Sequence, residues 1–436
     1  MTETSLDRII TEASFAGALG SEAEMFFRLA NTLEQQQGPS KARQHLYQLW
    51  IEADLVESFL DDHGAKHNRS FCYFRELMAS VRGFSQVGFR LEHLQNRLEG
   101  YDTLLAEDPD RSQACRESLF RARHFTRESI HSLIRDLRGE SASLGVHWGD
   151  NLFPEERFHS GHVNLRLPHN LGDEVLEEEE LKTAEVASKY LQVCSLFSEL
   201  SVRPLDDADA RERFLAQVCT EERARVYEAT VHNLQSAYDT HIKDTTMEAG
   251  DARLRRMRGH ASAAFHLLES VTGLAHFVER HEVGAREDDQ KRRIGELIDR
   301  TEVRDVTLNC LLYWASELLL LGEPLAREIL ASFSNVQEVE LHLPEGITLH
   351  ARPVSLIVAV VNRYEMPVEM EVAGKSCNAA SILEVLINAG SNPDESRYVF
   401  RGDARPLMDI KLLFEASLGE NGLQDLPATL SYLVGE

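Results

Sequence analysis

The segment GITLHARPVS, from Gly346 to Ser355, ends a short apolar stretch with a histidine, an arginine and a proline. A neutral, exposed imidazole can attack a phosphoryl group near neutral pH. A helix that begins directly after His350 would offer free N–H groups and the positive end of its dipole to the phosphate. Pro353 suits the first turn of such a helix, and Arg352 adds planar donors for phosphate oxygens. These residues predict that His350 accepts a phosphoryl group; an exposed loop histidine is the alternative.

The elements around His350 alternate between two periodicities. Apolar residues recur with period two in VQEVELHLP, MPVEMEVAGKS and SRYVFRGD, which predicts three strands and leaves room for a fourth. Between and after them, helical stretches run over Pro353 to Tyr364, Ser381 to Ala389 and Arg405 to Ser417. We therefore expect an α+β domain over residues 336–436.

Together, LHARP and the later GKSCNAASILEVL resemble HPr, the histidine-containing phosphocarrier of the bacterial phosphoenolpyruvate-dependent sugar phosphotransferase system. The resemblance runs roughly from Val336 to Gly422, and it includes Tyr364, the turn at Gly374-Lys375-Ser376, and Asn378. It implies an open-faced β-sandwich with helices on one face of an antiparallel sheet. It also implies a cytoplasmic bacterial protein.

The family's functional residues map onto this sequence position by position. The resemblance implies that His350 accepts phosphate through Nδ1 and that Arg352 lies beside the phosphate. Ser381 matches a serine that a dedicated kinase phosphorylates in some bacteria. The residues that match the partner-docking surface are Pro353, Leu383, Leu386 and Ile387. The partners implied are proteins like enzyme I and enzyme II, or an HPr serine kinase.

Some positions depart from the family pattern. Thr348 stands where the family usually has glycine, and Pro367 and Pro393 are atypical. Residues 336–436 hold 15 Asp/Glu and 7 Lys/Arg, so their formal charge is 7 − 15 = −8. The family's docking face depends on apolar and basic contacts, so this acidity predicts weaker association with a standard partner.

The residues before the strands have a helical character. No proline lies between Pro204 and Pro324, and apolar stripes at three- and four-residue steps predict roughly seven to ten helices over residues 21–333. Residues 1–20 are expected to be flexible, and the irregular stretch 145–174 either divides the helical region into two subdomains or serves as a long connection. The fold class expected for the whole chain is a large all-α amino-terminal region followed by the α+β domain. A homodimer through the helices is left open.

Composition excludes several classes of function. The formal net charge of −26 argues against a nucleic-acid coat. The start of the chain lacks the features of a secretion signal, and the longest apolar run is too short to span a bilayer. Six widely spaced cysteines fit reduced thiols in a cytoplasm better than disulfides or a zinc site. No cofactor is expected, since the sequence contains no glycine-rich nucleotide motif.

Three other groups of residues are candidate sites. His159, His162 and His169 lie near carboxylates and could bind a metal, but their spacing matches no standard site, so no metal is expected. The histidines of HFVERHE are five residues apart, whereas a zinc helix needs four. The basic run ARLRRMRGH, Ala252 to His260, is interpreted as a solvated helix face that pairs with neighbouring acids, with an anion or partner site as the alternative.

The leading hypothesis is an HPr-like phosphocarrier or regulatory protein, rather than a stand-alone enzyme. In it, His350 takes a phosphoryl group from the phosphotransferase system and relays it, or signals through the helical region. The alternative is a non-catalytic interaction or scaffold protein that uses the HPr-like fold for docking. A third hypothesis, an enzyme in the helical region regulated by the carboxy-terminal domain, lacks a recognisable catalytic constellation.

Overall fold

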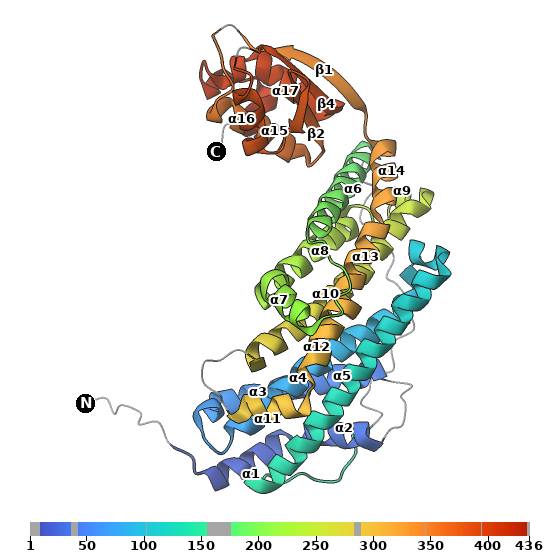
Figure 1. Cartoon of the computed structure of the whole chain (residues 1–436), viewed down its shortest axis with the longest axis vertical. Helices are drawn as coiled ribbons and strands as arrows, with labels where there is room; N and C mark the ends of the chain where they lie inside the picture. Colours follow the sequence, from blue (N-terminus) through green and yellow to red (C-terminus); the bar gives the residue numbers. More distant parts are fainter. Residues whose placement is uncertain are drawn as a thin grey trace, which may run out of the picture. The chain divides into compact units, whose positions relative to one another are not determined.

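The computed structural model describes residues 9–35, 42–101, 103–154, 176–282, 289–344, 346–393 and 395–433. The part before the sheet is helical (Figure 1). Its helices are α1 (Glu12–Glu22), α2 (Glu24–Gln35), α3 (Ala42–Asp62), α4 (Cys72–Arg97), α5 (Pro109–Leu144), α6 (Leu176–Glu199), α7 (Ala208–Val218), α8 (Glu221–His241), α9 (Thr246–Gly250), α10 (Ala252–Glu282), α11 (Asp289–Leu297), α12 (Arg300–Asp305), α13 (Tyr313–Leu321) and α14 (Glu323–Phe333).

The described residues thus form 14 α-helices before the sheet, more than the roughly seven to ten predicted. Short helices such as α9 and α12 explain part of the difference, because they are too short to show a repeating apolar stripe. A π-helical segment, Val306–Leu312, joins α12 to α13 without a break. Helix ends follow local sequence: Asp108 caps α5 by accepting from the Arg111 N–H at 3.0 Å, and Gly145 ends it in the left-handed conformation.

The expectation of a flexible stretch over residues 1–20 is wrong from Glu12 onward, where α1 begins. Thr11 caps this helix, and Phe15, Ala16 and Leu19 are buried. Their burial stabilises a helix whose sequence begins polar and acidic. Most of the loop 145–174, including His159, His162 and His169, lies outside the described residues.

The chain divides into two compact units. One comprises Met1–Leu171, Phe197–His232 and Gly259–Leu321, and the other comprises Gly172–Leu196, Asn233–Arg258 and Gly322–Glu436. Helices α6, α8 and α10 therefore contribute residues to both units. The domain boundary predicted between residues 333 and 336 stays a prediction.

After α14 comes a four-stranded antiparallel sheet with strand order β1-β4-β2-β3. The strands are β1 (Val336–His342), β2 (Val368–Val372), β3 (Lys375–Asn378) and β4 (Arg397–Asp403), and the helices are α15 (Ala351–Tyr364), α16 (Ile382–Gly390) and α17 (Ala404–Glu415). β2 and β3 form a hairpin in which Ala373 and Gly374, both with positive φ, make the turn. The predicted fold class, a helical region followed by an HPr-like α+β domain, is confirmed.

The two faces of this sheet differ as the alternating sequence requires. Met370 and Phe400 point into a core shared with the helices, and Phe400 makes an edge contact with Phe414 at 5.7 Å between ring centroids. On the opposite face, Arg401 pairs with Glu338 at 2.7 Å and with Glu371 at 2.8 Å. One face is therefore packed and the other open, with cross-strand ion pairs on the open face.

Candidate functional site

His350 is the N-cap residue of α15. Its backbone is extended, with φ −101° and ψ −174°, and its carbonyl accepts the Val354 N–H at 3.1 Å. The imidazole is about half exposed, at 53%. The helix follows because Pro353 fixes φ in the first turn and because the next apolar residues, Val354, Leu356 and Ile357, are buried against the sheet. The sequence therefore places an accessible imidazole at the positive end of a helix.

The two ring nitrogens of His350 have different neighbours. Nδ1 accepts the Arg352 N–H at 3.4 Å, and Nε2 lies 3.4 Å from Glu420 Oε1. A nitrogen that accepts a hydrogen bond presents a lone pair, so we assign the proton of the neutral ring to Nε2. Nδ1 is then the atom that carries the free lone pair, and it lies at the α15 N-terminus, where backbone donors are available.

Arg352 and Glu420 are brought to the site by one short segment of chain. The Arg352 guanidinium donates to the Gly419 carbonyl at 3.3 Å, across 67 residues of sequence. Ser417, Leu418 and Gly419 all have positive φ, so the chain turns sharply after α17 and directs Glu420 towards His350. At Gly419 a Cβ would lie 3.0 Å from Leu356 Cδ1, so this close approach also favours glycine.

Glu420 is the residue that sequence reasoning missed. Its Oε1 is buried and has no hydrogen-bond partner, although it is within ion-pair distance of His350 Nε2. A buried carboxylate oxygen without a donor is costly, and a proton on Nε2 reduces that cost. No sequence motif predicted a role for this residue, because its position beside His350 depends on the left-handed turn before it.

Ser381 lies at the start of α16 and is half-buried. Its Oγ accepts the Glu384 N–H at 3.3 Å, and Glu384 Oε2 accepts the Asn378 N–H at 3.0 Å. Ser381 therefore caps α16 through its side chain, but this is not a full capping box, because the Ser381 N–H donates to the Asn378 carbonyl and not to Glu384. A phosphate on Ser381 would meet the positive end of the helix dipole and, within one turn, the carboxylate of Glu384.

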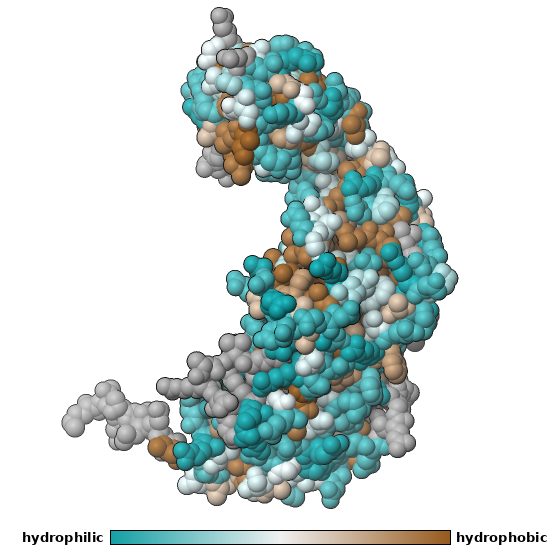
Figure 2. All heavy atoms as spheres, viewed as in Figure 1, coloured by the Kyte–Doolittle hydropathy of each residue, from teal (hydrophilic) through white to brown (hydrophobic). Residues whose placement is uncertain are grey.

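The residues predicted to form a docking surface divide into two groups. Leu383 and Ile387 are exposed, at 68% and 60%, and Ile382 beside them is exposed as well. Leu386 is half-buried against the core, and Pro353 is buried. In the view of Figure 2 most of the described surface is hydrophilic, and hydrophobic side chains gather in a few places, one of them on the carboxy-terminal domain. We therefore define the α16 surface as Ile382, Leu383 and Ile387, and we leave Pro353 out of it because its ring packs inside.

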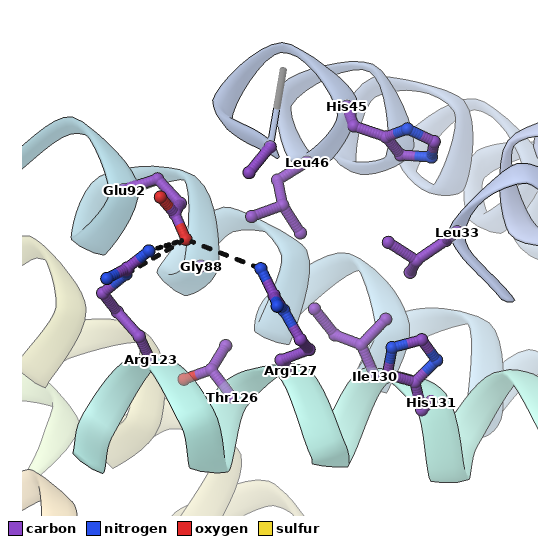
Figure 3. A pocket seen from close by; sticks show the side chains of 11 residues that line it. Leu33, His45, Leu46, Gly88, Glu92, Arg123, Thr126, Arg127, Ile130 and His131 are labelled. Atoms are coloured by element: carbon purple, nitrogen blue, oxygen red, sulfur yellow. Dashed lines mark hydrogen bonds and ion pairs between the residues drawn. The ribbon is translucent and has the colours of Figure 1, made fainter. Parts of the chain in front are cut away.

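A second candidate site is a pocket among α3, α4 and α5 (Figure 3). Its one carboxylate, Glu92, accepts from Arg123 at 2.6 and 3.0 Å, and Arg127 lies 4.0 Å away. His45 Nε2 contacts the Leu29 carbonyl at 3.0 Å, and burial lowers the pKa of His45, so the ring is neutral at pH 7. These groups satisfy one another, which indicates a structural role.

The remaining candidate residues have structural surroundings that give no sign of a functional site. In the basic run, Arg258 pairs with Asp239 at 2.6 Å, as expected for a solvated helix face. Burial raises the pKa of Cys310 to about 11 and that of Cys115 to about 12, so these thiols are poor nucleophiles. Within the described ranges, no cluster of three or more His, Cys, Asp or Glu could hold a metal ion. Of the helices described, none combines the length and the apolar character that crossing a bilayer requires.

Comparisons with known proteins bear on the carboxy-terminal part of the chain. No curated protein and no solved structure gave a significant match. Residues 336–395 match the family model described as PTS HPr component phosphorylation site. This match holds β1, the turn with His350, α15, the β2–β3 hairpin and α16. The resemblance predicted from LHARP and GKSCNAASILEVL is thereby confirmed: the carboxy-terminal part of the chain is an HPr domain, of the phosphocarrier type that belongs to the phosphotransferase system.

Proposed function

We propose that this protein is a cytoplasmic phosphocarrier or regulatory component in which His350 is the phosphoryl acceptor. The observation that carries the proposal is the half-exposed His350 ring at the N-terminus of α15, with Nδ1 accepting the Arg352 N–H. An imidazole in this place has both parts that the chemistry needs, a nitrogen lone pair to attack and backbone donors for the phosphate that arrives.

The transfer would proceed from a phosphohistidine donor of the enzyme I kind. The Nδ1 lone pair of His350 forms the new N–P bond while the donor's N–P bond breaks, and the donor imidazole keeps that electron pair. Backbone donors at the start of α15 and the Arg352 guanidinium receive the phosphoryl oxygens. The proton on Nε2 stays on the ring, which becomes a cation, and the Glu420 carboxylate 3.4 Å away stabilises it.

The chain would then pass the phosphoryl group to an enzyme II-like partner, or would use it as a signal read by the helical region. A simple carrier does not need a helical region of this size, so regulation is the output we favour. Ser381 would act as a second input: its phosphate would place negative charge beside the exposed Leu383 and thereby weaken docking.

The experiment uses the full chain with phosphoenolpyruvate and a competent enzyme I, and it measures phosphate that is labile in acid and stable in base. We expect this label on the wild type and its loss in His350→Ala. His342→Ala is the matched control, because His342 is an exposed histidine of the same domain at the end of β1. A label that persists in His350→Ala would refute the assignment. No label on the wild type, with an enzyme I that phosphorylates its own HPr, would favour the scaffold hypothesis.

A further inference from the structure

Helices α3 and α4 carry cationic and aromatic side chains on a shared face. The two helices run antiparallel, since Asp61 near the end of α3 pairs with Arg75 near the start of α4 at 2.7 Å. At their other ends, the exposed or half-buried residues of interest are Arg43, Tyr47 and Trp50 of α3 and Phe89, Arg90 and Arg97 of α4. Arg43, Tyr47 and Trp50 are spaced by four and three residues, and Arg97 follows Arg90 by seven, so each set lies on one side of its helix. Phe89 directly precedes Arg90, and the Arg90 guanidinium reaches over its ring. We name these six residues the arginine–aromatic surface.

Three rings form the centre of this surface. Tyr47 and Trp50 are 6.0 Å apart between ring centroids, and Phe89 lies 5.4 Å from Tyr47 and 6.1 Å from Trp50. Tyr47 is 45% exposed, and Trp50 and Phe89 are half-buried. A group of aromatic rings that keeps part of its area in water can still accept a stacked planar partner.

The arginines around the rings carry more positive charge than nearby acids balance. The guanidinium of Arg43 lies 5.2 Å from the centre of the Phe89 ring, and that of Arg90 lies 5.4 Å from it. Arg90 pairs with Glu269 of α10 at 2.9 Å. Among the residues that the structure describes, Arg43 and Arg97 form no ion pair. Within the described side chains, one carboxylate thus faces three guanidinium groups, in a chain whose formal net charge is −26.

The pKa shifts of neighbouring groups are consistent with this excess of positive charge. Burial lowers the pKa of Arg43, and the charges of Arg97 and Arg90 lower it further. His93, one turn from Arg90 and Arg97, has its pKa lowered to about 4, by burial first and then by His266 and the three arginines. Glu269 also lies 2.8 Å from His266 Nδ1, so its carboxylate is shared between Arg90 and His266.

We propose that the arginine–aromatic surface binds a nucleoside polyphosphate, with the phosphates on Arg43, Arg90 and Arg97 and the base stacked on the exposed rings. Arginine is the side chain best suited to phosphate oxygens, and several guanidiniums match several phosphates. The aromatic rings add stacking that inorganic phosphate cannot use. A long nucleic acid is disfavoured because the acidic remainder of the chain repels it.

Cation–π packing alone does not explain the arrangement. Stacking on Phe89 accounts for Arg43 and Arg90, and each such contact contributes about 0.5–1 kcal/mol at an exposed site. It does not account for Arg97, which adds like charge to the cluster and lowers the pKa of Arg43. A bound polyanion would relieve this repulsion.

The test titrates the full chain separately with ATP, GTP, adenosine and inorganic tripolyphosphate, and it follows heat and tryptophan fluorescence. We expect ATP or GTP to bind, adenosine not to bind, and tripolyphosphate to bind at least about tenfold more weakly than the nucleotide, since it lacks the ring. Of the chain's 3 tryptophans, Trp50 should give the response, so Trp50→Phe should abolish the fluorescence change and keep the heat.

The double variant Arg43→Gln/Arg97→Gln should weaken nucleotide binding by tenfold or more, because it removes two charged donors. Arg225→Gln/Arg327→Gln is the matched control, since both arginines are exposed and the change in charge is the same. Undetectable heat with ATP and GTP at millimolar concentration would overturn the proposal, as would equal affinity in the Arg43/Arg97 variant. If tripolyphosphate bound as tightly as ATP, the aromatic rings would not contribute to binding, and the proposed stacking of the base would be wrong. Saturation by polyglutamate without any nucleotide binding would assign the surface to an acidic protein instead.

Discussion

The α16 surface offers the sharpest quantitative test of the proposed docking. Leu383 and Ile387 leave 68% and 60% of their surface in water, which is unusual for large aliphatic side chains in a domain with a well-packed core. Fully burying such a side chain contributes about 1.5–3 kcal/mol. Scaled by these exposed fractions, covering both would contribute about 2–4 kcal/mol, of which the double change Leu383→Ala/Ile387→Ala would remove about 1.5–3 kcal/mol.

That loss corresponds to a 10- to 150-fold weaker complex, at about 1.4 kcal/mol for each factor of ten. The assay is the rate of His350 phosphorylation by enzyme I as a function of the concentration of this protein. In the proposed docking the two side chains contact the partner and not the phosphate, so KM should rise by this factor while kcat stays nearly constant. Met408→Ala is the control, since Met408 is 65% exposed on α17 and lies outside the α16 surface. A rise in KM of less than threefold, or an equal rise in the Met408 variant, would refute the reasoning.

Three further predictions concern the same domain. Glu420→Ala should lower the rate of His350 phosphorylation about 1.5- to 5-fold, which corresponds to about 0.2–1 kcal/mol for a partly exposed ion pair. Glu415→Ala is the control and should leave the rate unchanged. Equal rates in the two variants would show that Glu420 does not contribute to the site. Gly402→Ala would place a Cβ 2.9 Å from the Pro367 carbonyl oxygen and should destabilise the domain by about 1–3 kcal/mol in urea unfolding, whereas Gly390→Ala, with open space around it, should not. Burial, together with the hydrogen bond to Asp409, raises the pKa of Tyr364 to about 12, so the folded state holds this proton more tightly than the unfolded one. The stability contribution is therefore complete below pH 10 and is lost as pH rises from 10 towards 12; in Tyr364→Phe the slope of stability against pH in that range should be smaller, and an unchanged slope would contradict the assignment.

The sequence predicted the HPr domain well because its decisive features are local. The strand before His350, the helix after it and the turn at Ala373-Gly374 each depend on residues within a few positions, and the structure has all three. Leu383 and Ile387, which the family resemblance implied as docking residues, are exposed in the structure. Interactions within one turn or one hairpin are those that a periodic pattern can encode.

The helical region was harder to predict from the sequence, because an apolar stripe does not distinguish a buried core residue from an aromatic residue that stays partly exposed. Trp50 fits the same stripe as Leu49 and Ala53, yet it is half-buried beside Tyr47 and Phe89, while its neighbours in the stripe are fully buried. For α1 the error was the reverse: the acidic residues around Phe15 and Leu19 led us to predict a flexible segment, whereas these two side chains are buried. In both cases tertiary packing, and not helix periodicity, decides what the side chain contacts.

Glu420 shows where prediction from the sequence must fail for the site itself. Its carboxylate reaches His350 only because Ser417 and Leu418 adopt positive φ, which side chains of their kind rarely do. Each such residue costs about 1–3 kcal/mol and persists only where surrounding contacts compensate. Here the compensation comes from Leu418, which is completely buried in the core, and from the Arg352 bond to the Gly419 carbonyl. The contact that orients the histidine is thus held in place by the packing of α15 and α17 together, and no stretch of sequence shorter than the domain contains that information.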